Sequence, residues 1–256
     1  MTKYCSVRKS NHIMFVTIER PERLNALHPP ANSELGTVFD DFAADEDMWV
    51  AILTGSGRAF CAGNDLKYQA EGGEKLPFPM GFGGLTNRYN LNKPVIAAVN
   101  GVAMGGGFEI ALACDLIIAS DKATFALPEP KVGLAALAGG LNRLPRQIGP
   151  KQALGMILTG RHVPANEGYE MGFVTAVVPH SELDAESQAW AEQICECAPL
   201  SIRASMEVAY ASLDTSSLED SMSKKYATVK TLFESSDFVE GPRAFAEKRA
   251  PKWKGH

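Results

Sequence analysis

The sequence predicts an α/β protein built on a parallel or mostly parallel sheet. Two observations indicate it: short apolar runs with few polar positions recur along the first half, and amphipathic segments lie between them. Such runs are typical of strands covered on both faces, and their alternation with helices is typical of layered α/β folds. A chain of 256 residues is long enough to bury a large core without a disulfide or a metal.

Four apolar runs are the expected strands, and two helices are expected among them. The strands are Ile13–Ile18, 50–54, Val95–Val99 and 116–119. One helix is expected over 33–44, where Leu35, Val38, Phe39 and Phe42 recur at helical spacing, and another over 105–113. This order of strands and helices favours right-handed crossovers between parallel neighbours.

The remaining segments read as one long loop and a helical end. Residues 67–90 are rich in glycine and proline, and long loops of this kind are usually functional or mobile. From residue 183 onward the pattern predicts helices over 183–197, 199–213 and 218–233. Pro199 and Pro242 are expected to open helices at the first position, where a missing N–H costs nothing.

Charge and composition exclude several classes of function. The chain has 25 Lys and Arg against 30 Asp and Glu, a net charge of −5. Nucleic acids and anionic membranes attract basic surfaces, so neither is an expected partner. The first residues have no apolar stretch of the kind that a signal peptide needs. The apolar stretch 102–119 contains Glu109 and Asp115, which argue against a membrane span.

Cysteines and histidines give no sign of a disulfide framework or a metal centre. The five cysteines are irregularly spaced, and Cys195 and Cys197 form C-x-C rather than the C-x-x-C of zinc or redox sites. The five histidines are scattered without ligand spacing. We therefore expect reduced thiols, a cytoplasmic location and no metal.

Glu109 is the first candidate for chemistry, because it is the sole ionisable residue between Asn100 and Cys114. If it is buried, desolvation raises its pKa toward the range of a general acid or base. The alternative is a narrow exposed stripe on a buried helix. Gly105, Gly106 and Gly107 precede it, and their free N–H groups at a helix N-terminus suit developing negative charge. A tight turn without a ligand is the alternative there.

Two further turns complete the candidate site. The small residues of Phe60-Cys61-Ala62-Gly63-Asn64-Asp65-Leu66 follow a strand closely and offer a second N–H. Two N–H donors that converge from separate loops form an oxyanion hole. Glu129 lies between two prolines, Pro128 and Pro130, which fix the chain direction and suit a positioned side chain. The alternative for Glu129 is a surface residue paired with Lys131.

Together these residues resemble the crotonase superfamily, the enoyl-CoA hydratase/isomerase family. Each motif alone is weakly specific, but their order and spacing are highly specific and cover nearly the whole chain. The matching segments are Glu19-Arg20-Pro21, Leu24-Asn25-Ala26-Leu27, 60–66 (FCAGNDL), 93–109 (KPVIAAVNGVAMGGGFE), Ala113-Cys114-Asp115, Pro128-Glu129, Gly139-Gly140, Arg143-Leu144-Pro145, Leu158-Thr159-Gly160 and 241–254 (GPRAFAEKRAPKWK). Within the family, the chain most resembles carnitinyl-CoA (crotonobetainyl-CoA) dehydratases in its FALPE segment and its ending.

The resemblance implies a fold and an assembly. The fold is a spiral of repeated ββα units over residues 1–195, followed by a helical region over 196–256 that mediates trimers, often paired into hexamers. The substrate is an acyl-CoA thioester, with coenzyme A as part of the substrate and no other cofactor.

The resemblance also implies the site residues. Asn64 and Gly106 correspond to the two oxyanion donors, and Glu109 and Glu129 to the two catalytic glutamates. Phe245 and Lys248 correspond to residues that contact the adenine end of CoA, commonly across a subunit interface. The other implied CoA- or substrate-binding residues are Leu24, Ala26, Ala62, Gly63, Asp65, Leu66, Gly105 and Leu137.

Two glutamates favour hydration. The resemblance implies that Glu109 activates water and Glu129 delivers the proton, and that dehydration reverses these roles. Double-bond isomerases of the family generally use one acid/base glutamate, so isomerisation is less expected here. Residues 134–140 lack the Pro-Asp pair common in relatives and are small and apolar, which favours an apolar enoyl chain over a trimethylammonium group. The alternatives are a carnitinyl-CoA dehydratase and a non-catalytic acyl-CoA-binding protein.

Overall fold

The structure is a computed structural model that describes residues 2–73 and 79–256. The chain forms two units, Met1–Tyr89 with Pro94–Ala191, and Asn90–Lys93 with Glu192–His256. Each unit is a part of the chain that packs mainly with itself. The division into an acyl-CoA-binding core over residues 1–195 and a helical region over 196–256 stays a prediction.

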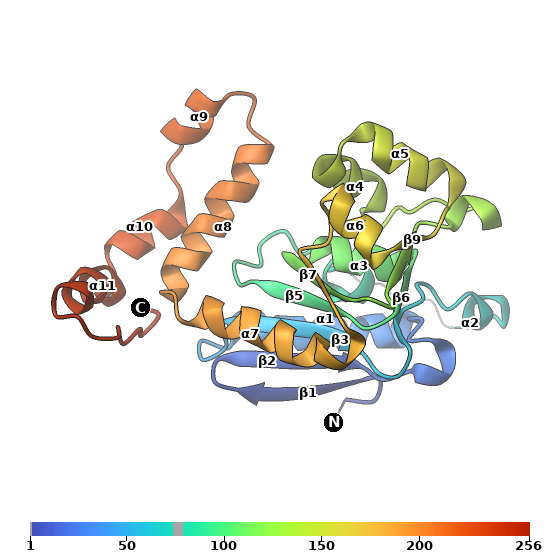
Figure 1. Cartoon of the computed structure of the whole chain (residues 1–256), viewed down its shortest axis with the longest axis horizontal. Helices are drawn as coiled ribbons and strands as arrows, with labels where there is room; N and C mark the ends of the chain where they lie inside the picture. Colours follow the sequence, from blue (N-terminus) through green and yellow to red (C-terminus); the bar gives the residue numbers. More distant parts are fainter. Residues whose placement is uncertain (1, 74–78) are drawn as a thin grey trace. The chain divides into compact units, whose positions relative to one another are not determined.

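The first unit contains a six-stranded sheet in the order β1-β2-β3-β5-β7-β10. Figure 1 labels its first five strands, coloured from blue to green. Its strands are β1 (Cys5–Ser10), β2 (Ile13–Ile18), β3 (Val50–Gly55), β5 (Val95–Val99), β7 (Leu116–Ser120) and β10 (Ala176–Val178). All neighbours are parallel except β1 and β2, which form an antiparallel hairpin. The mostly parallel sheet and the four predicted strands are confirmed. The pattern missed β1, because five of its six residues are exposed.

A second sheet in the same unit has the order β4-β6-β8-β9. It consists of β4 (Ala59–Cys61), β6 (Val102–Met104), β8 (Thr124–Ala126) and β9 (Val163–Pro164). The first three are parallel neighbours, and β9 pairs antiparallel with β8. Strands of two or three residues are too short to produce a periodic signal in the sequence.

The two sheets arise from a repeated unit of strand, strand and helix. The three repeats are β3-β4-α2, β5-β6-α3 and β7-β8 followed by the 3₁₀ helix η3 (Glu129–Val132) and α4. The first strand of each repeat enters the large sheet, and the second enters the small sheet. This is the spiral of ββα units that the sequence led us to expect.

The helices predicted over 33–44, 105–113 and 183–197 are confirmed, whereas the other helices of the first unit were not predicted. The helices that begin in this unit are α1 (Pro29–Ala44), α2 (Leu66–Ala70), α3 (Gly106–Ala113), α4 (Gly140–Ile148), α5 (Pro150–Thr159), α6 (Ala165–Met171) and α7 (Leu183–Cys195). Within the described ranges, no helix has the length and apolar character needed to cross a membrane. The predicted loop over 67–90 is interrupted by α2 and by the 3₁₀ helix η2 (Phe82–Gly84), and residues 74–78 of it lie outside the described residues.

The second unit is helical, with α8 (Pro199–Leu213), α9 (Leu218–Ser223), α10 (Ala227–Phe233) and α11 (Ser236–Ala246). Pro199 opens α8 as predicted. The single helix predicted over 218–233 is wrong, because Lys224 and Tyr226 are extended and the Glu207 carboxylate accepts the Thr228 N–H at the start of α10.

The expectation that Pro242 opens a helix is also wrong, since it lies inside α11. That helix begins earlier because the Ser235 hydroxyl accepts the Phe238 N–H at 3.1 Å and caps the N-terminus.

Candidate active site

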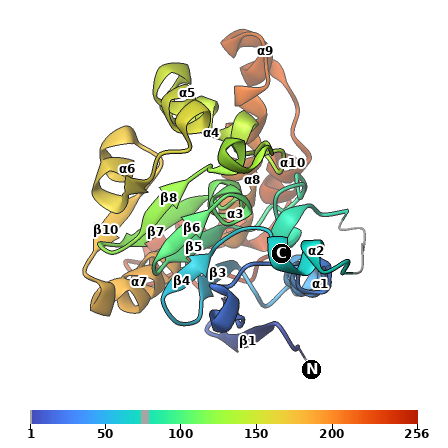
Figure 2. The same ribbon diagram turned by 90° about the vertical axis from the view of Figure 1, so that its right-hand side faces the viewer.

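The candidate residues lie in three turns, each following the second strand of a repeat. Asn64 follows β4, Gly106 follows β6 and Glu129 follows β8. Because β4, β6 and β8 are parallel neighbours, their carboxyl ends meet at one edge of the small sheet. Figure 2 shows the three strands side by side, with α3 next to β6. The repeat thus brings residues 65 positions apart in the sequence to one place.

Close contacts explain why three glycines open α3. A methyl group at Gly105 would lie 2.9 Å from Oε1 of Glu129, and one at Gly106 would lie 2.5 Å from the Phe82 ring. A methyl group at Gly107 would overlap the carbonyl oxygen of Cys61. Gly105 also has φ 53° and ψ −125°, a conformation that side chains other than hydrogen rarely allow. The glycines let Glu129 and the turn after β4 approach α3.

The two proposed oxyanion donors lie on turns in direct contact. A methyl group at Gly63 would lie 3.1 Å from the backbone nitrogen of Gly106. Within the described part of the chain, the N–H groups of Asn64 and Gly106 donate to no acceptor. Gly106 is the first residue of α3, so its N–H has no partner inside the helix. Both N–H groups are available to a ligand oxygen.

Glu109 is buried in the first turn of α3, with 3% of its surface exposed, so the exposed-stripe alternative is wrong. Its Oε1 accepts the Gly140 N–H at 2.9 Å. Burial raises the pKa of Glu109 to about 7, the Gly140 N–H acts against this, and the charge of Glu129 adds to it. Near neutral pH this carboxyl group is therefore poised between its acid and its base form.

Glu129 is half-buried, and its carboxyl group faces the same cavity as Glu109. Burial raises its pKa above the ordinary value. Its Oε2 atom is buried and has no hydrogen-bond partner among the described residues. Lys131 forms no ion pair with it, so the surface-pair alternative is wrong. A buried carboxyl oxygen without a partner is available to a ligand or a water molecule.

One cavity of about 470 Å³ collects these groups. Of the predicted residues, the following line it: Ala62, Gly63, Asn64, Leu66, Gly105, Gly106, Glu109, Glu129 and Leu137. Sequence reasoning noted Pro128 beside Glu129 but did not single out five other lining residues, namely Gly81, Phe82, Thr86, Asn87 and Val132. The glycine-rich stretch 79–84 was the available sign in the sequence that Gly81 and Phe82 lie at the site. Leu134, Ala135 and Ala138 also line the cavity, and they belong to the small apolar stretch noted in the sequence.

Three predicted residues near the cavity do not line it. Ala26 and Asp65 are buried, and Leu24 is half-buried. The backbone of this segment is bonded to the turn, since the Ala62 N–H donates to the Leu24 carbonyl at 3.0 Å.

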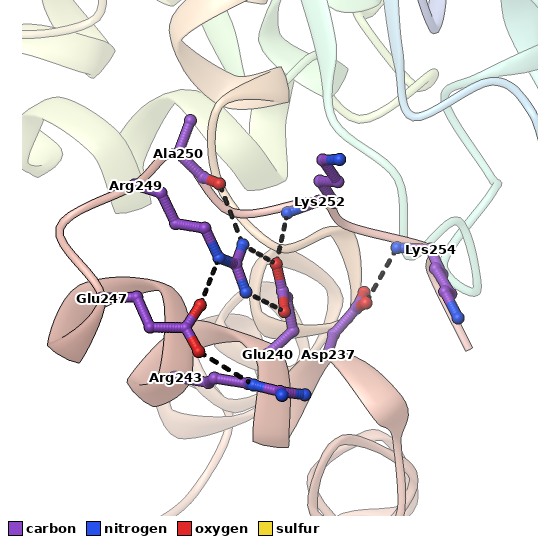
Figure 3. Close-up of polar contacts among 8 residues, drawn as sticks. All are labelled: Asp237, Glu240, Arg243, Glu247, Arg249, Ala250, Lys252 and Lys254. Carbon is purple, nitrogen blue, oxygen red and sulfur yellow. Dashed lines mark hydrogen bonds and ion pairs between the residues drawn. The ribbon is translucent and has the colours of Figure 1, made fainter.

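Phe245 and Lys248 belong to the second unit and do not line the cavity. The side chain of Phe245 is 88% exposed, and Lys248 has φ 52° in the left-handed region. The chain after α11 folds back onto that helix, as Figure 3 shows. Asp237 accepts the N–H groups of Lys254 and Gly255, both at 2.8 Å, and Glu240 accepts that of Lys252 at 2.8 Å.

The arginines of this basic end are engaged within it. Arg249 forms two hydrogen bonds with Glu240, at 2.6 and 2.9 Å, and its Nε bonds Glu247 at 2.6 Å (Figure 3). Arg243 bonds Glu247 at 3.2 Å. In the described ranges, the lysine side chains of this end have no acidic partner, which leaves Lys248, Lys252 and Lys254 as its accessible charges.

Residues 2–73 and 79–256 contain no group of three or more His, Cys, Asp or Glu side chains arranged to hold a metal ion. The cavity brings together two carboxyl groups and two unbonded N–H donors.

Comparison with known proteins agrees with this geometry. Residues 8–256 match the family model described as enoyl-CoA hydratase/isomerase. The chain is 43% identical over 265 residues to a carnitinyl-CoA dehydratase of Escherichia coli O157:H7, with 100% of each chain covered. It is also 43% identical over 249 residues to a carnitinyl-CoA dehydratase of Proteus mirabilis (strain HI4320), with 95% of each covered.

Solved structures of enoyl-CoA hydratases are also similar to this chain. The crystal structure of an enoyl-CoA hydratase from Mycobacterium tuberculosis H37Rv superposes with a TM-score of 0.93, at 37% identity and 99% coverage of both chains. That of an enoyl-CoA hydratase from Bacillus anthracis has a TM-score of 0.91, at 33% identity, with 99% of this chain and 100% of the other covered. With its ββα repeats and its paired glutamates, the chain belongs to the enoyl-CoA hydratase/isomerase family.

Proposed function

We propose that this chain catalyses the reversible addition of water across the double bond of a 2-enoyl-CoA thioester. The observation that carries the proposal is the placement of two carboxyl groups with raised pKa values, Glu109 and Glu129, in one cavity. The unbonded N–H groups of Asn64 and Gly106 lie on turns at the same cavity. Coenzyme A enters as part of the substrate, and the reaction requires no other cofactor.

The two N–H groups bind the thioester oxygen. When water adds to the β-carbon, electron density moves through the conjugated system and the thioester oxygen becomes enolate-like. Donors placed for that oxygen stabilise it more than they stabilise the ground state. The positive end of α3 lies at Gly106 and adds to this stabilisation.

The two carboxyl groups divide the proton transfers. Glu109 in its ionised form takes a proton from water as the oxygen bonds to the β-carbon. Glu129 in its protonated form then gives its proton to the α-carbon, and the enolate returns to a thioester. Glu109 ends protonated and Glu129 ionised, and exchange with solvent restores the starting state. Two interacting carboxyl groups at one cavity favour one shared proton. The cycle starts from the form in which this proton lies on Glu129 and Glu109 is ionised.

The number of carboxyl groups separates this reaction from its alternatives. Moving a double bond needs one group that takes a proton and returns it, whereas hydration needs groups for both water and carbon. A protein that only binds acyl-CoA has no use for two buried carboxyl groups, each of which costs folding free energy. Hydration therefore fits Glu109 and Glu129 better than isomerisation or binding alone.

The acyl group that fits the cavity best is apolar. Leu134, Ala135, Leu137, Ala138 and Phe82 are among the residues that line it. A second candidate is crotonobetainyl-CoA, which the full-length identity of 43% to carnitinyl-CoA dehydratases favours. The two reactions have the same chemistry and differ in the head group alone, so the ratio of kcat/KM for crotonyl-CoA and crotonobetainyl-CoA separates them.

The remaining family-derived roles are part of the same proposal. Leu24 and Ala26 support the bound CoA, Asp65 supports it indirectly through the turn that carries Asn64, and Phe245 and Lys248 contact its adenine end from a neighbouring subunit. This requires an oligomer, which the family resemblance gives as a homotrimer, alone or paired into a hexamer; light scattering of the purified protein tests it. A cytoplasmic location stays a prediction.

The experiment that tests the proposed function is a spectrophotometric assay with 2-enoyl-CoA thioesters of increasing chain length, with crotonobetainyl-CoA included. We expect loss of the enone absorbance and formation of the 3-hydroxyacyl-CoA. Saturable binding of every thioester without turnover of any would contradict the proposal.

A further inference from the structure

A buried ion pair lies directly behind the turn that carries Asn64. The Arg20 Nη2 atom donates to Oδ2 of Asp65 at 2.9 Å, and the two side chains are 10% and 5% exposed. Burying two charges costs several kcal/mol of desolvation, and replacing such pairs by apolar residues is often neutral or stabilising. Stability alone is therefore a weak explanation for this pair.

Both partners are tied to backbone on either side of the pair. Arg20 also donates through Nη1 to the Ala26 carbonyl oxygen. The Oδ1 atom of Asp65 accepts the Tyr68 N–H at 3.0 Å and caps α2. Although burial acts to raise it, the Tyr68 N–H and the Arg20 guanidinium together hold the pKa of Asp65 below its ordinary value. The pair is therefore charged at neutral pH, with one anchoring bond to backbone at each of its two ends.

The segment after Arg20 is held rigidly. The Arg20 N–H donates to Oδ1 of Asn25 at 2.9 Å, and the Asn25 Nδ2 donates to the carbonyls of Ser56 and Ala59 at 2.9 and 2.7 Å. Leu24 and Asn25 have φ values of 51° and 57°, in the left-handed region that residues other than glycine seldom adopt. Such a conformation persists only where the surroundings hold it.

This rigid segment in turn holds the Asn64 peptide. The Leu27 N–H donates to the Gly63 carbonyl at 2.8 Å, and the Asp65 N–H donates to the Leu27 carbonyl at 3.0 Å. Leu27 therefore bonds the residues on both sides of Asn64. Arg20 connects the two ends of this arrangement, since it bonds Ala26 next to Leu27 and Asp65 next to Asn64.

We propose that Arg20 and Asp65 are a positioning pair that fixes the direction of the Asn64 N–H toward the thioester oxygen. The inference rests on the proposed function, in which that N–H is an oxyanion donor. The pair touches no reacting atom and acts through the turn. An N–H displaced by a fraction of an ångström stabilises the developing charge less, while binding of the CoA part is largely retained.

The test compares Arg20→Met, Arg20→Lys and Asp65→Asn with wild type on crotonyl-CoA. For Arg20→Met and Asp65→Asn we expect kcat to fall by about 10- to 100-fold while KM changes by less than about fivefold. Arg20→Lys keeps the charge and recovers part of the loss. The control is Lys9→Met, which removes the surface pair between Lys9 and Asp45 (2.6 Å) and leaves both constants unchanged.

A second measurement follows the thioester carbonyl of a bound ligand. It distinguishes positioning of the Asn64 N–H by the Arg20–Asp65 pair from a role of the pair in stability alone. Bound [1-¹³C]butyryl-CoA is saturated and cannot be hydrated, and its infrared carbonyl band moves to lower frequency when N–H donors polarise it. We expect this shift in wild type and a smaller shift in folded Arg20→Met and Asp65→Asn. If Arg20→Met does not fold, Arg20→Lys and Asp65→Asn carry the test.

Two results would overturn the positioning role. One is an unchanged kcat and an unchanged carbonyl band in the folded variants; the other is a rise in KM alone. If wild type hydrates no enoyl-CoA yet shifts the butyryl carbonyl, the proposed function fails while the comparison of shifts still decides the role of the pair.

Discussion

Glu129 and Glu109 face one cavity, and the negative charge of Glu129 contributes to the raised pKa of Glu109. Burial raises the pKa of Glu109 more than the charge of Glu129 does, and the hydrogen bond from the Gly140 N–H lowers this pKa. The two carboxyl groups come from successive repeats, one after β8 and one on α3. Their mutual influence is therefore a consequence of how the repeats stack.

The first prediction concerns this influence. We expect Glu109 to titrate near pH 7 in wild type, and at a lower pH in Glu129→Gln, because the neighbouring charge is removed. Carboxyl ¹³C NMR or infrared difference spectroscopy follows the titration directly and does not need turnover. An identical pKa in both proteins would show that the two groups do not interact.

The second prediction is that Glu109→Gln gains stability as it loses activity. The folded pKa of Glu109 is about 7 and its ordinary value is 4.5, so the folded state binds more protons between these pH values. Wild-type stability therefore falls relative to the variant as pH rises from 4.5 to 7, by on the order of 3 kcal/mol, and the difference stays constant above pH 7.

Urea unfolding at pH 5 and pH 8 measures this difference. Glu46→Gln, at an exposed position, is the control and is expected to show no such pH dependence. Equal stability of Glu109→Gln and wild type at pH 8 would contradict the burial of an ionisable group at this position.

The third prediction uses two glycines with positive φ. Gly105→Ala places a methyl group 2.9 Å from the Glu129 carboxylate, whereas Gly149→Ala meets no atom within 4 Å. Both substitutions strain the backbone and cost about 1 kcal/mol or more. We expect kcat to fall at least about tenfold for Gly105→Ala and not for Gly149→Ala, because only Gly105→Ala displaces the reacting Glu129 carboxyl group. Comparable kcat losses in the two folded variants would argue against a role for the Gly105–Glu129 contact.

The fourth prediction concerns the adenine end of CoA. Lys248→Ala is expected to raise KM for the acyl-CoA several-fold with little change in kcat, because it removes uniform binding. Lys252→Ala removes the same charge from the same exposed end and is the control. Competition by free CoA and by dephospho-CoA shows whether the lost contact is to the nucleotide phosphates. Equal effects of the two substitutions would indicate a general charge effect instead.

The sequence predicted the elements with strong local signals and missed those defined by tertiary contacts. Val95–Val99 is buried at every position and was predicted with its correct bounds, whereas Cys5–Ser10 is a mostly exposed edge strand without an apolar run. The helix break at residues 224–226 depends on Glu207, a residue on another helix. Pro242 lies inside α11 because Ser235 caps the helix well upstream.

In the candidate site, too, the sequence predicted residues with a strong local signal and missed the tertiary contacts. Glu109 was recognisable as a lone charge in an apolar helix, and the glycines before it as a place of close approach. The atoms that approach them, in Phe82, Cys61 and Glu129, come from other parts of the chain and have no fixed offset in the sequence. The hydrogen bond from Gly140 to Glu109 spans 31 residues and is likewise set by tertiary packing.

The most direct test of the central claim is the rate of hydration by Glu109→Gln, Glu129→Gln and the double variant, with thioester binding measured on the same samples. We expect each single variant to lose about 10²- to 10⁴-fold in kcat, and the double variant to lose little more, because the two groups act as a unit. Binding of butyryl-CoA is expected to stay within a few-fold of wild type. Hydration at the wild-type rate by either folded single variant would contradict the account.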